Sequence, residues 1–250
     1  PHLHLEPDSG YGYVDEDGMV TVHSKSIGIH LHMPMIAAGI GVPMENLRLV
    51  QNHAGGTFGY KFSPTNEALI GAAAKILGVP VSLNFNQFQN ITYTGKRSPA
   101  FMHIKLAADE KGKLLSLWGD NYVDHGPYSE FGDLLTMRLS QFTGAGYGIP
   151  SIRNKSQTVF TNHAWGSAFR AYGSPQSFMG SEIAIDCLAA KMGIDPFEMR
   201  AMNCYKACEG TTIPTGYAPD VYCEEDLFNK ARPLYEAGKK RVAEKNAASD

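Results

Sequence analysis

The sequence has few cysteines, no long apolar run and no large excess of charge of either sign. Its 250 residues include four cysteines, which show neither CxxC pairs nor iron–sulfur spacing: Cys187, Cys204, Cys208 and Cys223. We therefore expect reduced thiols in a cytoplasmic protein. No segment approaches the roughly 20 apolar residues that cross a bilayer. With 22 basic against 25 acidic residues, the net charge of −3 gives no general field for nucleic acid or anionic membranes, so any anion site must be local.

Several known site motifs are also absent. No GxGxxG follows a first strand and no GxxxxGK[ST] occurs, which argues against a Rossmann dinucleotide site and a P-loop. Asp124-His-Gly126 and Ser129-Glu130 suggest a catalytic triad, but no GxSxG elbow accompanies them, so we do not predict one. The chain begins Pro1-His-Leu-His-Leu-Glu, without a basic and then apolar signal segment, and we interpret this start as cut from a longer protein.

The apolar content of 43% supports a core for one large domain or two modest lobes. Patterns typical of strands and helices alternate along the chain, which indicates an α+β fold. We predict two hairpins, at 11–23 and 103–123, and strands at 46–50, 80–85 and 157–161. Helices are expected at 63–77, 134–142, 174–192, 195–205 and 224–245.

Some local signals give more specific expectations. Ser63 is expected to cap a helix that has Pro64 at its first position. Its apolar stripe would consist of Leu69, Ile70, Ala73, Ile76 and Leu77. The stretch from Pro80 to Phe85 is expected to form a buried strand. A capping box is predicted at Asp195-Pro-Phe-Glu198.

Two glycine-rich loops share the pattern Gly-x-x-Phe-x-x-x-x-Ser-Pro, at residues 55–64 and 166–175. Each is expected between a strand and a helix start, where free backbone N–H groups and the helix dipole favour an anion. Arg170 adds a forked donor that suits phosphate, carboxylate or an oxo ligand. For one loop we would favour simple turns, with Arg170 paired to a surface acid. Two matching loops favour an anionic cofactor held between two lobes.

Two pairs of histidines have HxH spacing: His2 with His4, and His30 with His32. In a strand this spacing puts both imidazoles on one face and could begin a metal site. No further ligand can be assigned, so hydrogen bonding within strands or loops is the favoured interpretation. A metal-dependent hydrolase that uses the HxH pairs remains an alternative.

Five segments, spread over nearly the whole chain, carry a family resemblance. They are Gly55-Gly-Thr-Phe-Gly-Tyr-Lys61, Tyr93-Thr-Gly-Lys-Arg-Ser-Pro99, the region Asp124 to Leu134, Gly166-Ser-Ala-Phe-Arg-Ala-Tyr-Gly173 and Pro214-Thr-Gly216. In these segments the chain resembles the large, molybdenum-binding subunit of the xanthine oxidase family, most closely the bacterial aldehyde oxidoreductases that carry molybdopterin cytosine dinucleotide. The resemblance implies an α+β fold with mixed sheets and packed helices in two lobes.

The resemblance also implies roles for individual residues. The cofactor-binding residues would be Gly56, Phe58, Gly59 and Arg170. The substrate funnel would be lined by Phe62, Phe131, Leu134 and Tyr172. The implied chemistry is oxidation of an aldehyde to a carboxylic acid, in which a molybdenum-bound hydroxide attacks the carbonyl carbon with a glutamate as base. Electrons would then leave through two [2Fe–2S] centres.

The sequence departs from the family pattern in one respect that matters for catalysis. The base glutamate belongs to a GxGE motif, which does not occur here; Glu182 follows Gly180-Ser181 but lies in a predicted helix. We therefore expect no catalytic residue and no metal ligand in this chain. We interpret residues 1–250 as the first molybdopterin-binding domain, inactive and without cofactor when alone. Expected partners are the second molybdopterin-binding half, [2Fe–2S] domains or subunits, and an aldehyde substrate. A non-catalytic assembly module that binds a partner subunit is an alternative.

Overall fold

The computed structural model describes residues 2–128, 130–206, 213–218 and 220–248, so the predictions for Ser129 and Cys208 concern residues outside these ranges. The chain forms two compact units, as the two-lobe expectation requires. The first comprises Pro1–Ala100, Tyr122–Thr136 and Gln157–Tyr172, and the second comprises Phe101–Asn121, Met137–Ser156 and Gly173–Asp250. Within the described ranges, none of the helices has the length and hydropathy that a membrane crossing needs.

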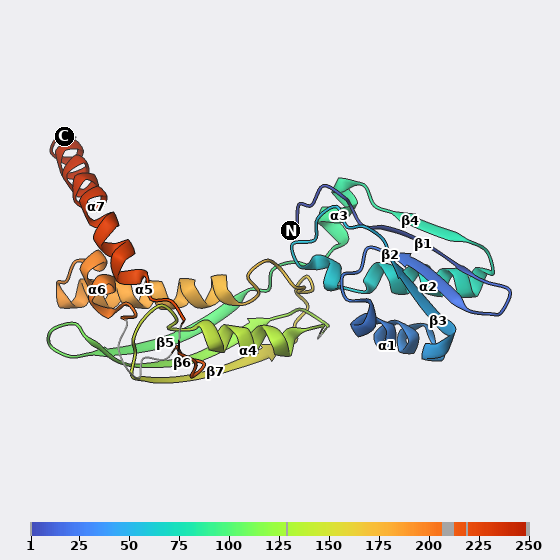
Figure 1. The fold of residues 1–250 in the computed structure, drawn as a ribbon, viewed down its shortest axis with the longest axis horizontal. Helices are drawn as coiled ribbons and strands as arrows, with labels where there is room; N and C mark the ends of the chain where they lie inside the picture. Colours follow the sequence, from blue (N-terminus) through green and yellow to red (C-terminus); the bar gives the residue numbers. More distant parts are fainter. Residues whose placement is uncertain (1, 129, 207–212, 219, 249–250) are drawn as a thin grey trace. The chain divides into compact units, whose positions relative to one another are not determined.

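The first unit contains a four-stranded mixed sheet with the order β3-β2-β1-β4 (Figure 1). Its strands are β1 (Ser9–Val14), β2 (Val20–Ser24), β3 (Leu47–Gln51) and β4 (Val81–Asn84). β1 and β2 form the predicted antiparallel hairpin, and β2 pairs with β3 in parallel. β4 lies at an edge and alternates between half-buried and exposed residues, so the prediction of a buried strand there was wrong.

Helices α1 (Ile29–Ile40) and α2 (Thr65–Leu77) share one apolar core with this sheet. Two short 3-10 helices, η1 (Met44–Asn46) and η2 (Tyr60–Phe62), and α3 (Gln87–Tyr93) complete the unit. The core residues come from both helices and from β2 and β3: Val20, Val22, Ile36, Ala37, Leu47, Leu49 and Ile70. Hydrophobic burial here therefore holds the strand that leads to the first glycine loop.

The start and the buried face of α2 differ from the prediction. The helix begins at Thr65 with Pro64 as its N-cap, and the buried Ser63 does not cap it. Of the predicted stripe, Ile70 is buried, but Leu69, Ile76 and Leu77 are 55%, 78% and 63% exposed. The buried face consists of Asn66, Glu67, Ile70, Gly71 and Ala74. Polar residues occupy it because Glu67 contacts the buried Lys25 and Ser24.

The second unit is built on a three-stranded sheet with the order β5-β6-β7. The strands are β5 (Ala100–Ala108), β6 (Leu114–Asp124) and β7 (Ser151–Val159), and the helices are α4 (Gly132–Phe142), α5 (Ser174–Met192), α6 (Pro196–Asn203) and α7 (Glu224–Ala247). The core residues are Leu114, Tyr147, Ile185, Ala189 and Met199. The predicted pairing of β5 with β6 and the helices at α4, α5 and α7 are confirmed.

Two local features of the second unit, the start of β7 and the cap of α6, differ from the prediction. β7 begins at Ser151, six residues before the predicted start at Gln157. At α6, the Asp195 carboxylate accepts the N–H groups of Phe197 and Glu198, as an N-cap should. Glu198 forms an ion pair with Arg232 of α7, so only half of the predicted capping box is present.

Candidate functional site

The two glycine-rich loops belong to the first unit and are held against each other. The first loop (residues 55–62) follows β3 and ends in η2, and the second loop (residues 166–172) precedes α5. The Arg170 N–H donates to the Phe58 carbonyl at 2.8 Å. A Cβ at Gly59 would lie 2.8 Å from the Ala168 carbonyl oxygen, which is closer than real Cβ contacts. Glycine at position 59 is therefore required for the loops to meet.

The shared sequence pattern does not produce a shared backbone. In the first loop φ is positive at Gly56, Phe58 and Gly59, at 105°, 46° and 101°. In the second loop Phe169 and Arg170 occupy the positions of Phe58 and Gly59, and neither is left-handed; Ala171 is, at 64°. Non-glycine residues pay roughly 1–3 kcal/mol for such a conformation, which is most often found at functional sites. The two loops therefore have different backbone conformations where they face each other.

Residues of both loops line a cavity of about 280 Å³. Its lining includes six of the eight predicted site residues: Gly59, Phe62, Phe131, Leu134, Arg170 and Tyr172. The remaining lining residues are Leu31, Ala168, Phe169 and Ala171. An apolar cavity with one charged donor is typical of a small-molecule site.

The other two predicted residues, Gly56 and Phe58, lie outside this lining. Gly56 packs on the segment before β1, where a Cβ would be 3.0 Å from the His4 Cβ. The Phe58 side chain is 42% exposed. Their predicted role in cofactor binding stays a prediction.

The aromatic residues of the cavity contact one another. The rings of Phe62 and Phe131 meet edge to face at 6.1 Å between centroids. The Tyr172 hydroxyl donates to the Phe131 carbonyl at 2.7 Å. Burial raises the pKa of Tyr172, so its hydroxyl stays protonated and keeps donating this hydrogen bond. The segment around Phe131 is thereby tied to the second loop.

Basic residues gather at the second loop without acidic partners. The Arg97 guanidinium donates to the Arg170 carbonyl at 2.7 Å and lies 4.3 Å from the centre of the Phe169 ring. Burial lowers the pKa of both Arg97 and Lys96. Among the described residues no carboxylate pairs with Lys96, Arg97 or Arg170, so the structure does not support a surface ion pair for Arg170. An anionic ligand would supply the missing negative charge.

A buried pair of polar residues supports the start of the second loop. The Ser98 hydroxyl and the His125 Nδ1 are 2.8 Å apart, and both side chains are buried. Gly166 lies directly on this pair, and a Cβ there would overlap both side chains. Burial lowers the pKa of His125, which keeps it neutral. Beyond the histidine itself, no pattern in the sequence pointed to this pair.

Sequence reasoning also missed the role of the N-terminal segment (residues 2–8). Leu3 and Leu5 are exposed, whereas His2 and His4 are buried, the reverse of the usual alternation. His2 Nε2 lies 2.8 Å from the Ala168 carbonyl of the second loop. The Glu6 carboxylate accepts the Gly55 N–H of the first loop at 2.7 Å. The alternation of polar residues at His2, His4 and Glu6 is the sequence signal from which one inward, polar face could have been predicted.

The HxH pairs do not form a metal site within the described residues, where no group of three or more His, Cys, Asp or Glu could hold an ion. His30 and His32 lie on helix α1, so the one-face arrangement that a strand would give does not apply to them, and only His32 is buried. Residues two apart on a helix point to different sides. His32 Nδ1 lies 2.6 Å from the Ser26 hydroxyl. The hydrolase alternative therefore loses its structural basis in this part of the chain.

A buried group of charges lies beside the first loop. Lys25 Nζ donates to the Ser63 carbonyl at 2.9 Å and is 3.6 Å from carboxylates of both Asp8 and Glu67. The ammonium also lies 4.9 Å from the centre of the Tyr60 ring, in the last turn of that loop. Nearby, burial raises the pKa of Glu130 to about 7, although Ser63 and Lys25 oppose the shift.

Known proteins resemble this chain over most of its length. Residues 1–204 match the model of the family described as "Molybdopterin cofactor-binding domain". The chain is 52% identical over 249 residues to the aldehyde oxidoreductase of Megalodesulfovibrio gigas, covering 100% of this chain and 27% of that protein. It is 28% identical over 215 residues to the nicotinate dehydrogenase large molybdopterin subunit of Eubacterium barkeri, covering 86% and 50%.

The fold is shared with solved structures as well. The crystal structure of the aldehyde oxidoreductase from Desulfovibrio desulfuricans ATCC 27774 matches with a TM-score of 0.88 and 56% identity over 98% of this chain. Quinoline 2-oxidoreductase from Pseudomonas putida 86 has the same fold at 21% identity, with a TM-score of 0.83. The chain spans 27% of the aldehyde oxidoreductases that it matches.

Proposed function

The chain belongs to the family of molybdopterin cofactor-binding domains, and from this premise we propose that it supplies one side of a molybdenum site in an enzyme that oxidises aldehydes to carboxylic acids. Residues 1–250 would be the first molybdopterin-binding domain of that enzyme. The similarity to two aldehyde oxidoreductases, at 52% and 56% identity, supports the reaction class. The segments that carried the family resemblance support it as well.

One observation carries the proposal: both glycine loops line a single cavity whose only charged lining residue is Arg170. Its guanidinium has no acidic partner among the described residues, so its donors are available to an anionic group. The residues present therefore fit one side of a cofactor that carries negative charge. The holding residues would be Gly56, Phe58, Gly59 and Arg170.

When bound, the cofactor would supply two-electron oxidation of the substrate, with water as the source of oxygen. Arg170 would stabilise negative charge that develops on the substrate oxygen, which is worth most where water is excluded. Phe62, Phe131 and Leu134 would exclude that water and orient the substrate, and the Tyr172 hydroxyl would fix the Phe131 backbone. This chain supplies no general base in our proposal, because no GxGE segment occurs in it.

The complete site would need more than this chain. We propose the second molybdopterin-binding half and [2Fe–2S] domains or subunits as partners, an aldehyde as substrate and the cytosine dinucleotide as the cofactor form. The reduced thiols Cys187, Cys204 and Cys223 support a cytoplasmic location. Because contacts to the cofactor would be shared between halves, the isolated chain would hold it weakly and show no activity.

A second candidate, a non-catalytic assembly module that binds a partner subunit, is favoured by one observation. Leu69, Ile76 and Leu77 expose more than half of their side chains on α2. Exposed apolar side chains on one helix are typical of an interface when they form a patch. This role is compatible with the cofactor site, since the partner half would also need a docking surface.

The test is to express a longer protein that contains this chain in a host that makes molybdopterin, and to measure bound molybdenum and pterin fluorescence. We expect both in the parent, and about a tenfold lower molybdenum occupancy in Arg170→Ala, since a charge-assisted contact is lost. The control is Arg153→Ala, an exposed arginine on β7 in the second unit, which should retain occupancy. Absence of molybdenum and pterin, or equal losses in both variants, would contradict the proposal.

A further inference from the structure

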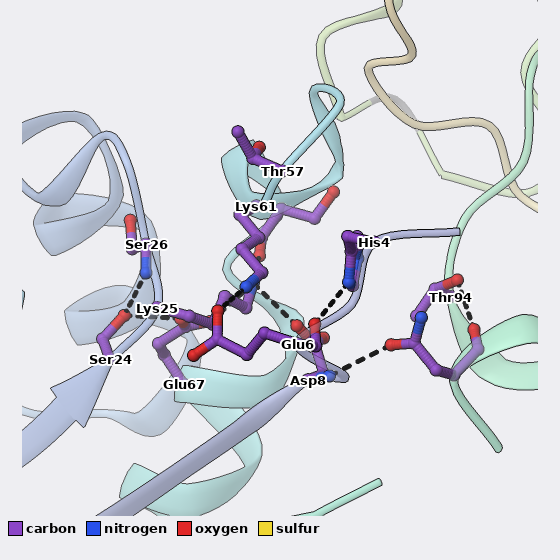
Figure 2. Close-up of polar contacts among 12 residues, drawn as sticks. His4, Glu6, Asp8, Ser24, Lys25, Ser26, Thr57, Lys61, Glu67 and Thr94 are labelled. Carbon is purple, nitrogen blue, oxygen red and sulfur yellow. Dashed lines mark hydrogen bonds and ion pairs between the residues drawn. The ribbon is translucent and has the colours of Figure 1, made fainter. Parts of the chain in front are cut away.

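The Glu6 side chain contacts both ends of the first loop. Its carboxylate accepts the Gly55 N–H at the start of the loop at 2.7 Å. The same carboxylate pairs with the Lys61 ammonium near the end of the loop (Figure 2). The Glu6 N–H also donates to the Gly55 carbonyl at 3.2 Å. One residue outside the loop therefore joins the two positions between which Phe58 and Gly59 lie.

The chain is built to let Glu6 approach this closely. A Cβ at Gly55 would lie 2.6 Å from the Glu6 Cβ, so a larger residue there would displace the segment. Gly55 is exposed and its φ is not in the left-handed region, so the turn itself does not require glycine at this position. The close approach of Glu6 gives a physical reason for it.

Lys61 depends on Glu6 for its charge partner. Its side chain is 0% exposed, and Glu6 is the carboxylate with which it pairs among the described residues. Burial alone would raise the pKa of Glu6, but the hydrogen bonds from Lys61 and Gly55 outweigh it and lower that pKa. The carboxylate is therefore charged at neutral pH, as a buried ammonium requires.

The same segment also reaches the second loop. The His2 ring lies 4.1 Å from the Phe169 ring, and its Nε2 contacts the Ala168 carbonyl at 2.8 Å. His4, between the two, contacts the Glu6 carbonyl through Nδ1. Residues 2–6 therefore connect the second loop to the first through side chains that are buried or half-buried.

We propose that Glu6 is a positioning residue, which closes the first loop through Gly55 and Lys61 and thereby sets where Phe58 and Gly59 meet the second loop. The inference rests on the proposed function for its consequence, since these loops would hold the cofactor. The loop geometry itself does not depend on it. Glu6 is not among the residues that line the cavity and would act only through the loop.

Hydrogen exchange followed by mass spectrometry on the 250-residue chain tests this directly. In Glu6→Gln, we expect exchange in peptides covering 56–62 and 168–172 to accelerate about tenfold, since a charge-assisted contact at the loop is lost. Peptides from β2 should keep the parent rate. The control is Asp195→Asn in the second unit, whose carboxylate likewise binds backbone N–H groups and a lysine, Lys239. It should leave both loops unchanged.

A double variant guards against general destabilisation. Glu6→Gln with Lys61→Met removes the buried ammonium along with its partner, so the fold should be largely restored. If Glu6 positions the loop, exchange at 56–62 stays fast in this double variant. Unchanged loop exchange in Glu6→Gln, equal acceleration in β2, or recovery of parent loop rates in the double variant would each overturn the inference.

The two proposals fail separately. Fast loop exchange in Glu6→Gln, together with no molybdenum or pterin in the longer protein, would leave the positioning role standing and remove the cofactor. Parent-like loop exchange in Glu6→Gln, together with bound molybdenum in the longer protein, would remove the positioning role and leave the cofactor site standing.

Discussion

The two glycine-rich loops share the pattern Gly-x-x-Phe-x-x-x-x-Ser-Pro, yet they are held by different kinds of contact. The first loop is fixed by charge, through Glu6 and Lys61. The second loop has no ion pair among the described residues and is fixed by the His2 contact with Ala168 and the cation–π contact of Arg97 with Phe169. Equivalent phenylalanines accordingly differ, because Phe58 is 42% exposed while Phe169 is half-buried. The short shared pattern thus did not determine the loop conformation, which the surrounding residues decided.

The largest loss of stability should follow a substitution at Gly59, where the two loops touch. Gly59→Ala puts a methyl group 2.8 Å from the Ala168 carbonyl at a residue with φ of 101°. Clash and backbone strain together should lower the free energy of unfolding by about 4 kcal/mol. Gly18→Ala is the control, because φ is 81° there but nothing lies within 4 Å, and it should cost about 1 kcal/mol. Urea denaturation measures both, and equal losses would show that the loops do not meet.

Acid should remove the supports of the two loops in different pH ranges. Burial lowers the pKa of His2 to about 4. Between pH 6.5 and 4, therefore, this histidine is protonated in the unfolded chain but stays neutral in the folded chain. Stability therefore falls as pH falls through this range, by about 2 to 3 kcal/mol between pH 7.5 and 4.5. The Glu6 pKa is lowered, so its contribution is complete above about 4.5 and is lost only at more acid pH.

The variant His2→Gln tests the first of these ranges, because glutamine can still donate to the Ala168 carbonyl without titrating. Denaturant titrations at pH 7.5 and 4.5 should show a smaller difference in the variant than in the parent. The exposed His163 provides the control, and His163→Gln should behave like the parent. A parent-like pH dependence in His2→Gln would place the acid sensitivity elsewhere.

The smallest effect should appear at the left-handed residue of the second loop. Ala171 has φ of 64°, which glycine adopts more easily, so Ala171→Gly should stabilise the protein by about 0.5 kcal/mol. Ala168→Gly, at a residue without positive φ in the same loop, should instead destabilise it by a similar amount. Thermal unfolding of both variants, measured side by side, decides the sign. Loss of stability in Ala171→Gly would mean that its methyl group packs usefully in the cavity.

Much of the fold followed from local patterns. The β1–β2 hairpin and the helix that begins at Ser174 were predicted because turn and capping signals act within a few residues of one another. The family resemblance named Phe131, Tyr172 and Arg170 as site residues, and all three line one cavity, while their roles stay predictions. Periodicity alone does not reach that far, since these residues come from separate parts of the chain.

Two of the failures share a physical cause, which is the burial of polar groups by partners distant in the sequence. The α2 stripe was predicted from apolar residues, but Glu67 faces inward because Lys25 of another segment compensates its charge. Leu69 and Ile76 were thereby left exposed. The N-terminal segment was likewise missed, since its buried histidines find carbonyl partners as far away as Ala168. No rule based on sequence spacing detects such pairs.

The hydrogen bond from the Arg170 N–H to the Phe58 carbonyl uses only main-chain atoms. Any side chain except proline at position 170, and any that tolerates a left-handed backbone at position 58, can therefore be exchanged without breaking this link. At these two positions, the side chain that would face a ligand can therefore be changed without changing the backbone contact that joins the loops. Libraries that randomise residue 170 while keeping Gly59 would explore new ligand preferences on an unchanged framework.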